Sequence, residues 1–409
     1  MERFRPVGER IKLVGERLKA AFASSWTNHR VPTIAASAVA VIAVIAIVAA
    51  GVLVVVMPGG KTTVASPSAK ASIAASASAS PSASPTVLYS PSEIAGGSPT
   101  PLPSGWAYAD LDGMPAAAAQ AHALPMAIMI SDNAVARPQS GISMASIVYQ
   151  AYAEGGEDRY MMVFQEQNAT DIGPVRSARP DYVYWAAEYK ALYAHDGGSP
   201  KALYQVIPAM ANYIYDENAS SGGSCPYHRI TTRLAPQNEY TNSATLISCA
   251  ANRGYPATYR DLPVRTFRDD IEFAQRPASQ QIAIAYRTAS IGYQFNAYSD
   301  NYTRLIDGTP EIDPANGSSV YARTVVVMYQ AVTIDPQSDP GYQRVIIHNV
   351  GIGGKATIFM EGKQIAATWT KASNTALTRF YDASGNEIPF VRGEIFMEST
   401  PPGTEVLVK

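Results

Sequence analysis

Short apolar runs alternate with polar loops over residues 124–210. The runs of strand length are Met126–Ile130, Tyr160–Phe164 and Ala191–Ala194. The segments with helical spacing or a helix-starting proline are Ile142–Val148, Pro180–Glu188 and Lys201–Met210. This alternation predicts a three-layer α/β domain over residues 106–275, with polar loops gathered at the ends of the strands.

The pattern changes after residue 276, where short apolar runs are separated by turns rather than by helices. The runs include Thr324–Met328, Arg344–His348, Ala356–Met360, Gln364–Trp369, Thr378–Tyr381 and Glu394–Met397. Two of the connections, Glu361–Gln364 and Asp382–Asn386, have the composition of hairpin turns. We therefore expect a β-rich C-terminal domain of antiparallel strands over residues 276–409.

An uncharged segment of 24 residues, Ile34–Met57, precedes both domains. A helix of that length crosses the hydrocarbon layer of a membrane, so the segment predicts a single transmembrane helix. A cleaved signal peptide is the alternative, but the apolar region of a signal peptide is shorter. Residues 58–105 consist mainly of Ser, Ala, Pro, Thr and Gly, and this composition predicts a disordered stalk.

The charge distribution orients this segment. Residues 1–33 contain seven basic and three acidic residues, although the whole chain has a net charge of −2. A basic tail on one side of a membrane helix predicts a cytoplasmic N-terminus and extracytoplasmic domains. From residue 106 onward, acidic residues outnumber basic ones by 30 to 23, which disfavours nucleic acid as a partner.

The two cysteines, Cys225 and Cys249, both lie in the part predicted to be extracytoplasmic. Oxidising conditions there favour a disulfide, although two unpaired buried thiols are the alternative. A zinc site is disfavoured because only Cys225 and His228 are close in sequence. We expect neither a metal nor a cofactor.

Four arginines lie in or beside the polar loops: Arg137, Arg159, Arg176 and Arg179. Guanidinium groups are suited to binding carboxylate or phosphate. The sequence therefore suggests an anion site, with internal ion pairing as an equally weighted alternative. The candidate ligand-binding residues are Asp132, Asn133, Arg137, Gln139, Glu154, Arg159, Arg176, Ser177, Arg179, His195, Gly197, Gly198 and Ser199.

Catalytic candidates are fewer. His195 is a candidate general base oriented by Asp196, or a metal ligand with Asp132 and Asp216, but a structural histidine at a strand end is the simpler interpretation. Ser177 and Ser199 lack the motifs that surround nucleophilic serines. Asp132 and His195 therefore remain the candidate catalytic residues.

The loop sequences resemble those of the YerB-like family of bacterial envelope proteins, also called DUF3048. The resemblance rests on Ile130–Asn133, Ala136–Gly141, Glu154–Gly156, Gly173–Arg179 and His195–Ser199, and it extends from about Leu124 to the C-terminus. It implies an anchored envelope protein with an N-terminal α/β domain and a smaller C-terminal domain, and it implies no activity. Gln237 stands where relatives tend to have histidine, which weighs against a catalytic histidine there.

Together these features predict a membrane-anchored extracytoplasmic binding protein of the cell envelope, with peptidoglycan or an anionic cell-wall precursor as its ligand. An envelope hydrolase or a transferase acting on phosphate-linked glycan, using Asp132, His195 and the arginines, is the alternative. A third possibility is a partner of proteins that synthesise the cell wall. Whether the protein is an enzyme stays open at this point.

Overall fold

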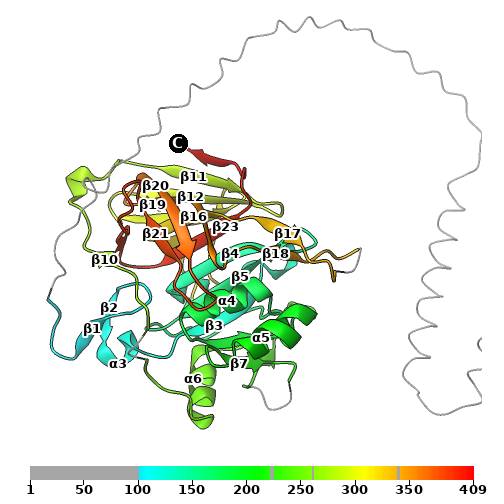
Figure 1. Cartoon of the computed structure of the whole chain (residues 1–409). Coiled ribbons are helices and arrows are strands. Elements are labelled where there is room, and N and C mark those ends of the chain that lie inside the picture. Colours follow the sequence, from blue (N-terminus) through cyan, green and yellow to red (C-terminus); the bar gives the residue numbers. More distant parts are fainter. Residues whose placement is uncertain (1–100, 222–224, 260–261, 339–340) are drawn as a thin grey trace, which may run out of the picture. The chain divides into compact units, whose positions relative to one another are not determined.

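Two sheets form the core of the described part of the protein in its computed structural model (Figure 1). The structure describes residues 101–221, 225–259, 262–338 and 341–409. The predicted membrane segment 34–57, the basic tail and nearly all of the stalk lie outside these residues. Within the described ranges, no helix has both the length and the apolar character that crossing a membrane requires.

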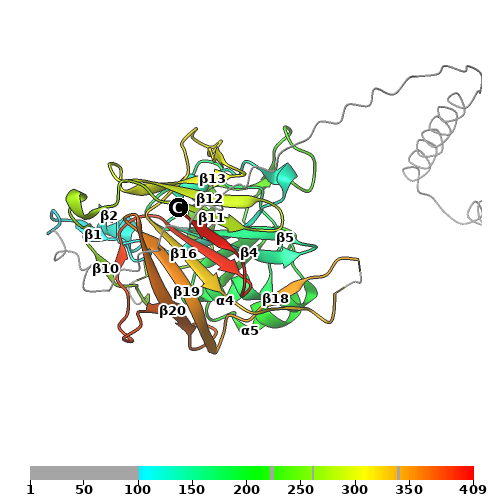
Figure 2. The ribbon, with the colours of Figure 1, turned by 90° about the horizontal axis from the view of Figure 1, so that it is seen from above.

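The larger sheet has ten strands and draws on both halves of the chain. In spatial order they are β21 (Arg379–Tyr381), β20 (Lys363–Lys371), β19 (Ile352–Met360), β16 (Thr324–Tyr329), β23 (Ile395–Thr400), β4 (Ile147–Glu154), β5 (Glu157–Phe164), β3 (Met126–Ser131), β6 (Leu192–His195) and β7 (Tyr215–Asn218). Strand β23 pairs in parallel with both β16 and β4, so it joins the C-terminal strands to the N-terminal ones. The predicted domain boundary near residue 276 therefore does not divide this sheet, which contains strands from both sides of it. Figure 2 shows β20, β19 and β16 of the C-terminal half following on from β4 and β5 of the N-terminal half.

The smaller sheet has six strands and comes entirely from the C-terminal half. They are β14 (Thr309–Pro310), β13 (Asn301–Ile306), β12 (Ser290–Asn296), β11 (Gln281–Ala285) and β24 (Val406–Val408), with β15 (Tyr321–Ala322) pairing on β13. Alternate residues of β12 are buried and exposed. This is the pattern of a strand that packs on one face only.

Helices are few and short among the described residues. They are α3 (Ala118–Ala121), α4 (Pro180–Glu188), the π-helical turn η4 (Ala202–Val206), α5 (Ile207–Ala209), α6 (Ser243–Asn252), and the 3-10 turns η2 (Ala134–Ala136), η3 (Ile142–Met144) and η5 (Phe273–Gln275). Four strand pairs complete the fold: β1 (Trp106–Tyr108) with β2 (Pro115–Ala117), β8 (His228–Arg229) with β9 (Glu239–Tyr240), β10 (Phe267–Arg268) with β22 (Phe390–Val391), and β17 (Val332–Ile334) with β18 (Val345–Ile347).

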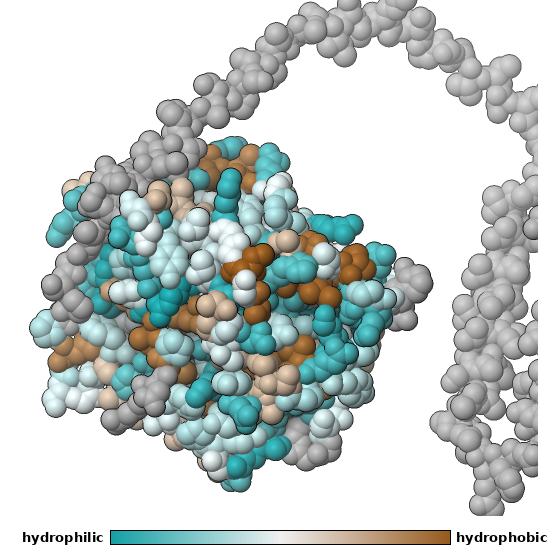
Figure 3. All heavy atoms as spheres, in the orientation of Figure 1, coloured by the Kyte–Doolittle hydropathy of each residue, from teal (hydrophilic) through white to brown (hydrophobic). Residues whose placement is uncertain are grey.

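The two faces of the ten-stranded sheet pack on different layers. Side chains alternate along each strand, so Met161 and Val163 of β5 face one layer while Tyr160 and Met162 face the other. The first layer contains α4, η4 and α5. The second contains the six-stranded sheet and α6. On the surface shown in Figure 3, hydrophobic residues lie in several separate patches among hydrophilic ones.

Several predicted elements are present, but the helix expected over Ile142–Val148 is wrong. Only Ile142–Met144 forms a 3-10 turn, and β4 begins at Ile147. The β-branched and aromatic residues after Ile147 favour a strand, and both β23 and β5 supply backbone partners for it. The three-layer α/β prediction is accordingly not confirmed, because strands predominate and a second sheet covers most of one face.

The C-terminal strands are present as predicted, although their pairing is not wholly antiparallel, since β23 runs parallel to both neighbours. The predicted turn after Met360 connects β19 to β20 through Glu361 and Gly362, which have φ values of 53° and 74°. A Cβ on Gly362 would lie 2.6 Å from the ring of Phe295. This position therefore requires glycine for its backbone conformation and for its space.

Candidate functional site

Two of the predicted loops meet beside the carboxyl ends of β3 and β6. The backbone N–H of Arg176 donates to the carbonyl of Met129 (2.8 Å), and the N–H of Asp196 donates to the carbonyl of Arg176 (3.0 Å). The N–H of Ala178 donates to the carbonyl of Gly197 (3.0 Å). The segments 173–179 and 195–199 are therefore held side by side, as expected for loops at one edge of a sheet that contains parallel strands.

Three of the four candidate arginines converge around one carboxylate. Arg159 and Arg179 both form ion pairs with Glu154, and the Arg179 Nε to Glu154 Oε2 distance is 2.5 Å. Arg176 forms no ion pair with Glu154 among the described residues, but it is close enough for the charges of Arg159 and Glu154 to shift its pKa. We call Arg159, Arg176 and Arg179 the arginine cluster. Arg159 enters it from β5, on the face that carries Met161, whereas the other two come from the loop before α4.

Burial and mutual repulsion dominate the electrostatics of this cluster. Burial and the neighbouring Arg159 lower the pKa values of Arg176 and Arg179. Burial acts to raise the pKa of Glu154, but the adjacent Arg159 and Arg179 overcome it and lower that pKa to about 2. Glu154 is thus ionised at every physiological pH, and among the described residues it is the one carboxylate that forms ion pairs with Arg159 and Arg179.

Some donors of the cluster have no acceptor. The buried Nε and Nη1 atoms of Arg159 and the buried Nε atom of Arg176 lack a hydrogen-bond partner. Arg159 is only 3% exposed, so water does not easily compensate for these missing bonds. Ser177, which lies between Arg176 and Arg179 in sequence, is partly exposed, as are Gly197 and Gly198 of the facing loop. These residues mark the open side of the cluster.

Arg137 does not join the other three arginines. Its Nε donates to Asp132 Oδ1 (2.9 Å), and Asp132 also accepts from Gln139 and Gln150. Asp132 is fully buried, on the face of the large sheet that packs against the six-stranded sheet. Asn133 caps η2 through its side chain. The structure therefore places Asp132, Asn133, Arg137 and Gln139 in a network of internal bonds.

His195 is fully buried, and both of its ring nitrogens face oxygen atoms. Nδ1 lies 2.6 Å from the carbonyl oxygen of Gly197, and Nε2 lies 2.8 Å from Asp216 Oδ1. Both ring nitrogens are thus occupied by partners within the protein, so this geometry suits a structural histidine. Asp196 does not orient the ring, because its carboxylate accepts from the hydroxyl of Ser220 instead.

The remaining loop candidates have local roles in the backbone. Gly198 forms a bridge with Ala178, and a Cβ at this position would lie 2.8 Å from Leu203. Ser199 is buried, and its hydroxyl accepts from the N–H of Ala202 at the start of η4. Gly198 and Ser199 therefore hold the 195–199 loop against its neighbours.

Tyr342 is a site residue that the sequence did not reveal. It lies between β17 and β18, and its hydroxyl donates to Glu154 Oε1 (2.9 Å). The N–H of Gly155 donates to the carbonyl of Gln343, which joins this segment to the end of β4. One tyrosine among 24 carries no distinguishing local signal, and only the long-range pairing brings it to the site.

A second buried polar cluster, between the two sheets, was also missed. Arg304 of β13 is fully buried and donates to Glu311, to Gln150 and to the hydroxyl of Tyr160. Glu398 of β23 accepts from the hydroxyl groups of Tyr286 and Tyr293. The residues come from distant strands, so no spacing in the sequence could have grouped them.

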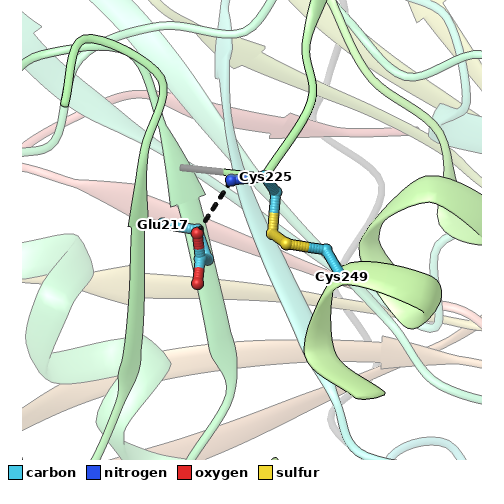
Figure 4. Close-up of side chains that lie close together, drawn as sticks. All are labelled: Glu217, Cys225 and Cys249. Atoms are coloured by element: carbon cyan, nitrogen blue, oxygen red, sulfur yellow. Dashed lines mark hydrogen bonds between the residues drawn. A yellow bond between two sulfur atoms is a disulfide. The ribbon is translucent and has the colours of Figure 1, made fainter. Parts of the chain in front are cut away.

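Two groups of side chains in the described residues have the proximity of metal ligands, but each is otherwise engaged. Cys225 and Cys249 form a disulfide, with Cα atoms 5.6 Å apart, beside Glu217 (Figure 4). Their sulfur atoms are therefore not thiolate ligands. The second group, Asp270, Asp300 and Glu361, is paired with Arg268, Arg276 and Arg323.

Comparison with known proteins identifies the family but no activity. Residues 111–256 match the N-terminal domain, and residues 282–397 the C-terminal domain, of a family described as "Protein of unknown function (DUF3048)". The chain is 28% identical over 281 residues to "Putative lipoprotein YerB" of Bacillus subtilis strain 168, covering 68% of this chain and 81% of that protein. The crystal structure of the YerB protein from Bacillus subtilis aligns with a TM-score of 0.64 and 25% identity, over 74% of this chain and 99% of that one. Because the two domain matches together cover more than half of its length, the chain belongs to the YerB-like DUF3048 family.

Proposed function

We propose that this protein is an extracytoplasmic binding protein of the bacterial cell envelope and that the arginine cluster is its ligand site. The ligand is an anionic envelope component, such as a peptidoglycan fragment or a cell-wall precursor. The predicted membrane segment 34–57 anchors the protein, and the stalk 58–105 gives the folded part its reach. The name of the Bacillus subtilis relative, a lipoprotein, supports an envelope location.

The observation that carries the proposal is the imbalance of charge and of hydrogen bonds at the cluster. Arg159 and Arg179 both contact a single carboxylate, Glu154, Arg176 lies near it without an ion pair among the described residues, and two of the arginines retain buried donors without acceptors. If the ion pairs with Glu154 were the only compensation, three positively charged guanidinium groups would remain close together in a buried site, which costs folding free energy. A bound anion would supply both the missing charge and the missing acceptors.

The positions of the catalytic candidates favour binding over hydrolysis or group transfer. Asp132 lies on the face of the sheet that packs against the six-stranded sheet, whereas the arginine cluster lies on the face that packs against α4. Both ring nitrogens of His195 already have partners. A general acid–base pair made of Asp132 and His195 would need both groups to face one substrate.

The test measures ligand-induced stabilisation of the full-length protein in detergent micelles, followed by intrinsic tryptophan fluorescence during heating. The ligands are muropeptides, polyprenyl phosphates and inorganic anions. Arg176→Gln is the informative variant because the Arg176 side chain has no hydrogen bond or ion pair within the described part of the chain. Arg137→Gln is the matched control, since it removes a loop arginine outside the cluster.

The proposal expects an anionic ligand to raise the melting temperature of the wild type and of Arg137→Gln, but not that of Arg176→Gln. It also expects unliganded Arg176→Gln to melt no lower than the wild type, because the substitution removes a repelled charge. A lower melting temperature of Arg176→Gln without ligand, together with no stabilisation of the wild type by any anion, would assign the arginines a purely architectural role.

A further inference from the structure

We infer that the group recognised by the arginine cluster is a phosphate in its doubly charged form. This inference rests on the anion-binding role proposed above and narrows it to one chemical class. It covers a phosphate carried by a soluble sugar and one carried by a lipid, since both present the same terminal group.

The first argument is charge. Arg159 and Arg179 share one contacting carboxylate, Glu154, and Arg176 contacts no acid among the described residues, so the three guanidinium groups and Glu154 together carry a net charge of +2. A phosphate monoester carries about −1.5 to −2 at pH 7, whereas a carboxylate carries only −1. Asp196, a further acid whose charge acts on Arg176, is partly exposed and forms no ion pair with the cluster among the described residues; its carboxylate accepts from Ser220. A doubly charged ligand therefore balances the buried charge better than a carboxylate does.

The second argument is the arrangement of the free donors. The unpartnered nitrogens belong to Arg159, on β5, and to Arg176, on the loop before α4, so they reach the site from two separate elements. The hydroxyl of Ser177 has no hydrogen bond among the described residues and offers a further donor on the same loop as Arg176. Phosphate offers oxygen acceptors in a tetrahedral array, whereas the two oxygens of a carboxylate lie in one plane.

The third argument is the absence of a side chain at residue 197. Gly197 has φ of 65°, and a Cβ there would be in van der Waals contact with the hydroxyl oxygens of Ser220 (3.7 Å) and Ser177 (3.9 Å). Any residue other than glycine would be strained at this φ and would place its side chain against Ser177. Glycine at this position therefore leaves the hydroxyl of Ser177 uncovered by a side chain of residue 197.

The experiment compares three ligands on the full-length protein by isothermal titration calorimetry: glucose 1-phosphate, glucuronate and inorganic sulfate. At pH 8 we expect glucose 1-phosphate to bind at least tenfold more tightly than glucuronate. Between pH 8 and pH 5.5 its affinity should fall about fourfold relative to that of sulfate, because the second pKa of a phosphate monoester is about 6 and sulfate remains doubly charged.

The sulfate measurement also corrects for titration of the protein itself. The titratable groups around the cluster in the described residues are Glu154, Tyr342, Tyr182, Tyr193, Asp181, Asp196, Asp216 and His195. They affect both doubly charged ligands alike. Arg176→Gln should abolish binding of glucose 1-phosphate, Ser177→Ala should weaken it, and Arg137→Gln should leave it unchanged.

The outcomes separate this inference from the proposed function. Equal affinity for glucuronate and glucose 1-phosphate, with both lost in Arg176→Gln, would overturn the preference for phosphate and leave an anion site. No binding of any of these ligands, nor of a polyprenyl phosphate, would overturn both. A polyprenyl phosphate in nanodiscs that binds tenfold more tightly than glucose 1-phosphate would support the phosphate and assign it to a lipid, whereas the reverse order would support a soluble phosphate.

Discussion

Glu154 is the residue whose replacement tests the electrostatics of the arginine cluster most directly. It is 1% exposed, it accepts from Arg159, Arg179 and Tyr342, and no other carboxylate in the described part of the chain forms an ion pair with Arg159 or Arg179. Glu154→Gln preserves the shape of the side chain but removes the charge. The variant therefore leaves buried guanidinium groups without a counter-charge, and we expect it to be strongly destabilised.

The magnitude follows from the pKa of Glu154. Burial opposes ionisation, but Arg159 and Arg179 lower the pKa from 4.5 to about 2. That difference corresponds to about 3.4 kcal/mol of folding free energy above pH 4.5, at about 1.36 kcal/mol for each pKa unit. A carboxyl group with a lowered pKa loses this contribution as the pH falls from its unfolded value towards its folded one. At pH 3 about 1.4 kcal/mol should remain.

The assay is urea unfolding of the full-length protein, followed by tryptophan fluorescence, at pH 7 and pH 3. Trp185 of α4 is a suitable reporter because it is buried and stacks on Tyr149 of β4. Glu157→Gln is the matched control, since Glu157 forms no ion pair in the described part of the chain and lies at the start of the neighbouring strand. A Glu154→Gln variant as stable as the wild type at pH 7, or an equally large deficit at both pH values, would refute the reasoning.

Three further predictions concern stability. Burial and the nearby Asp132 raise the pKa of Asp158 to about 8, so the wild type should lose stability as the pH rises from 4 towards 8. Relative to the wild type, Asp158→Asn should gain about 4 kcal/mol of unfolding free energy between pH 5 and pH 9, measured by urea unfolding at each pH. Lys371→Met should cost about 3–5 kcal/mol, because it removes the closer of the two cations that pair with the buried Glu188 and leaves only Arg265 at 3.9 Å; the double variant with Glu188→Leu should cost less than the sum of the single variants in a thermodynamic cycle. Replacing both cysteines of the disulfide, 24 residues apart in sequence, with serine should cost roughly 3.5 kcal/mol in the same assay; a loss below 1 kcal/mol would contradict the chain-entropy account.

Local signals in the sequence were reliable where a residue's role depends on its near neighbours. Pro180 starts α4 as predicted, the turn after Met360 is present, and the C-terminal runs form strands. The helix predicted over residues 142–148 is absent, because a run with so few apolar positions fits the periodicity of a helix and that of a strand equally well. The choice there was made by strands β23 and β5, which pair with β4 from distant parts of the chain.

The candidate site shows the same division. Arginines in polar loops pointed to an anion, but the sequence could not indicate which of them meet. Arg159 lies near the start of β5, and Arg137 follows the end of the neighbouring β3. Because side chains alternate along a strand, Arg159 lies on the face that packs against α4, whereas Arg137 pairs with Asp132 on the opposite face. A shift of one residue along a strand reverses the face of the sheet, so the exact pairing register decides membership of the site.

The sequence by itself therefore determined the family, the kinds of chemistry present and most of the strands, because these depend on composition, on short motifs and on local periodicity. Only the tertiary structure decided that one sheet contains strands from both halves of the chain, that Tyr342 reaches Glu154, and that Arg159 and Arg179 share a single carboxylate with Arg176 nearby. These features arise from contacts between residues far apart in sequence. Such contacts are set by packing and by backbone pairing across the whole fold, which no local pattern specifies.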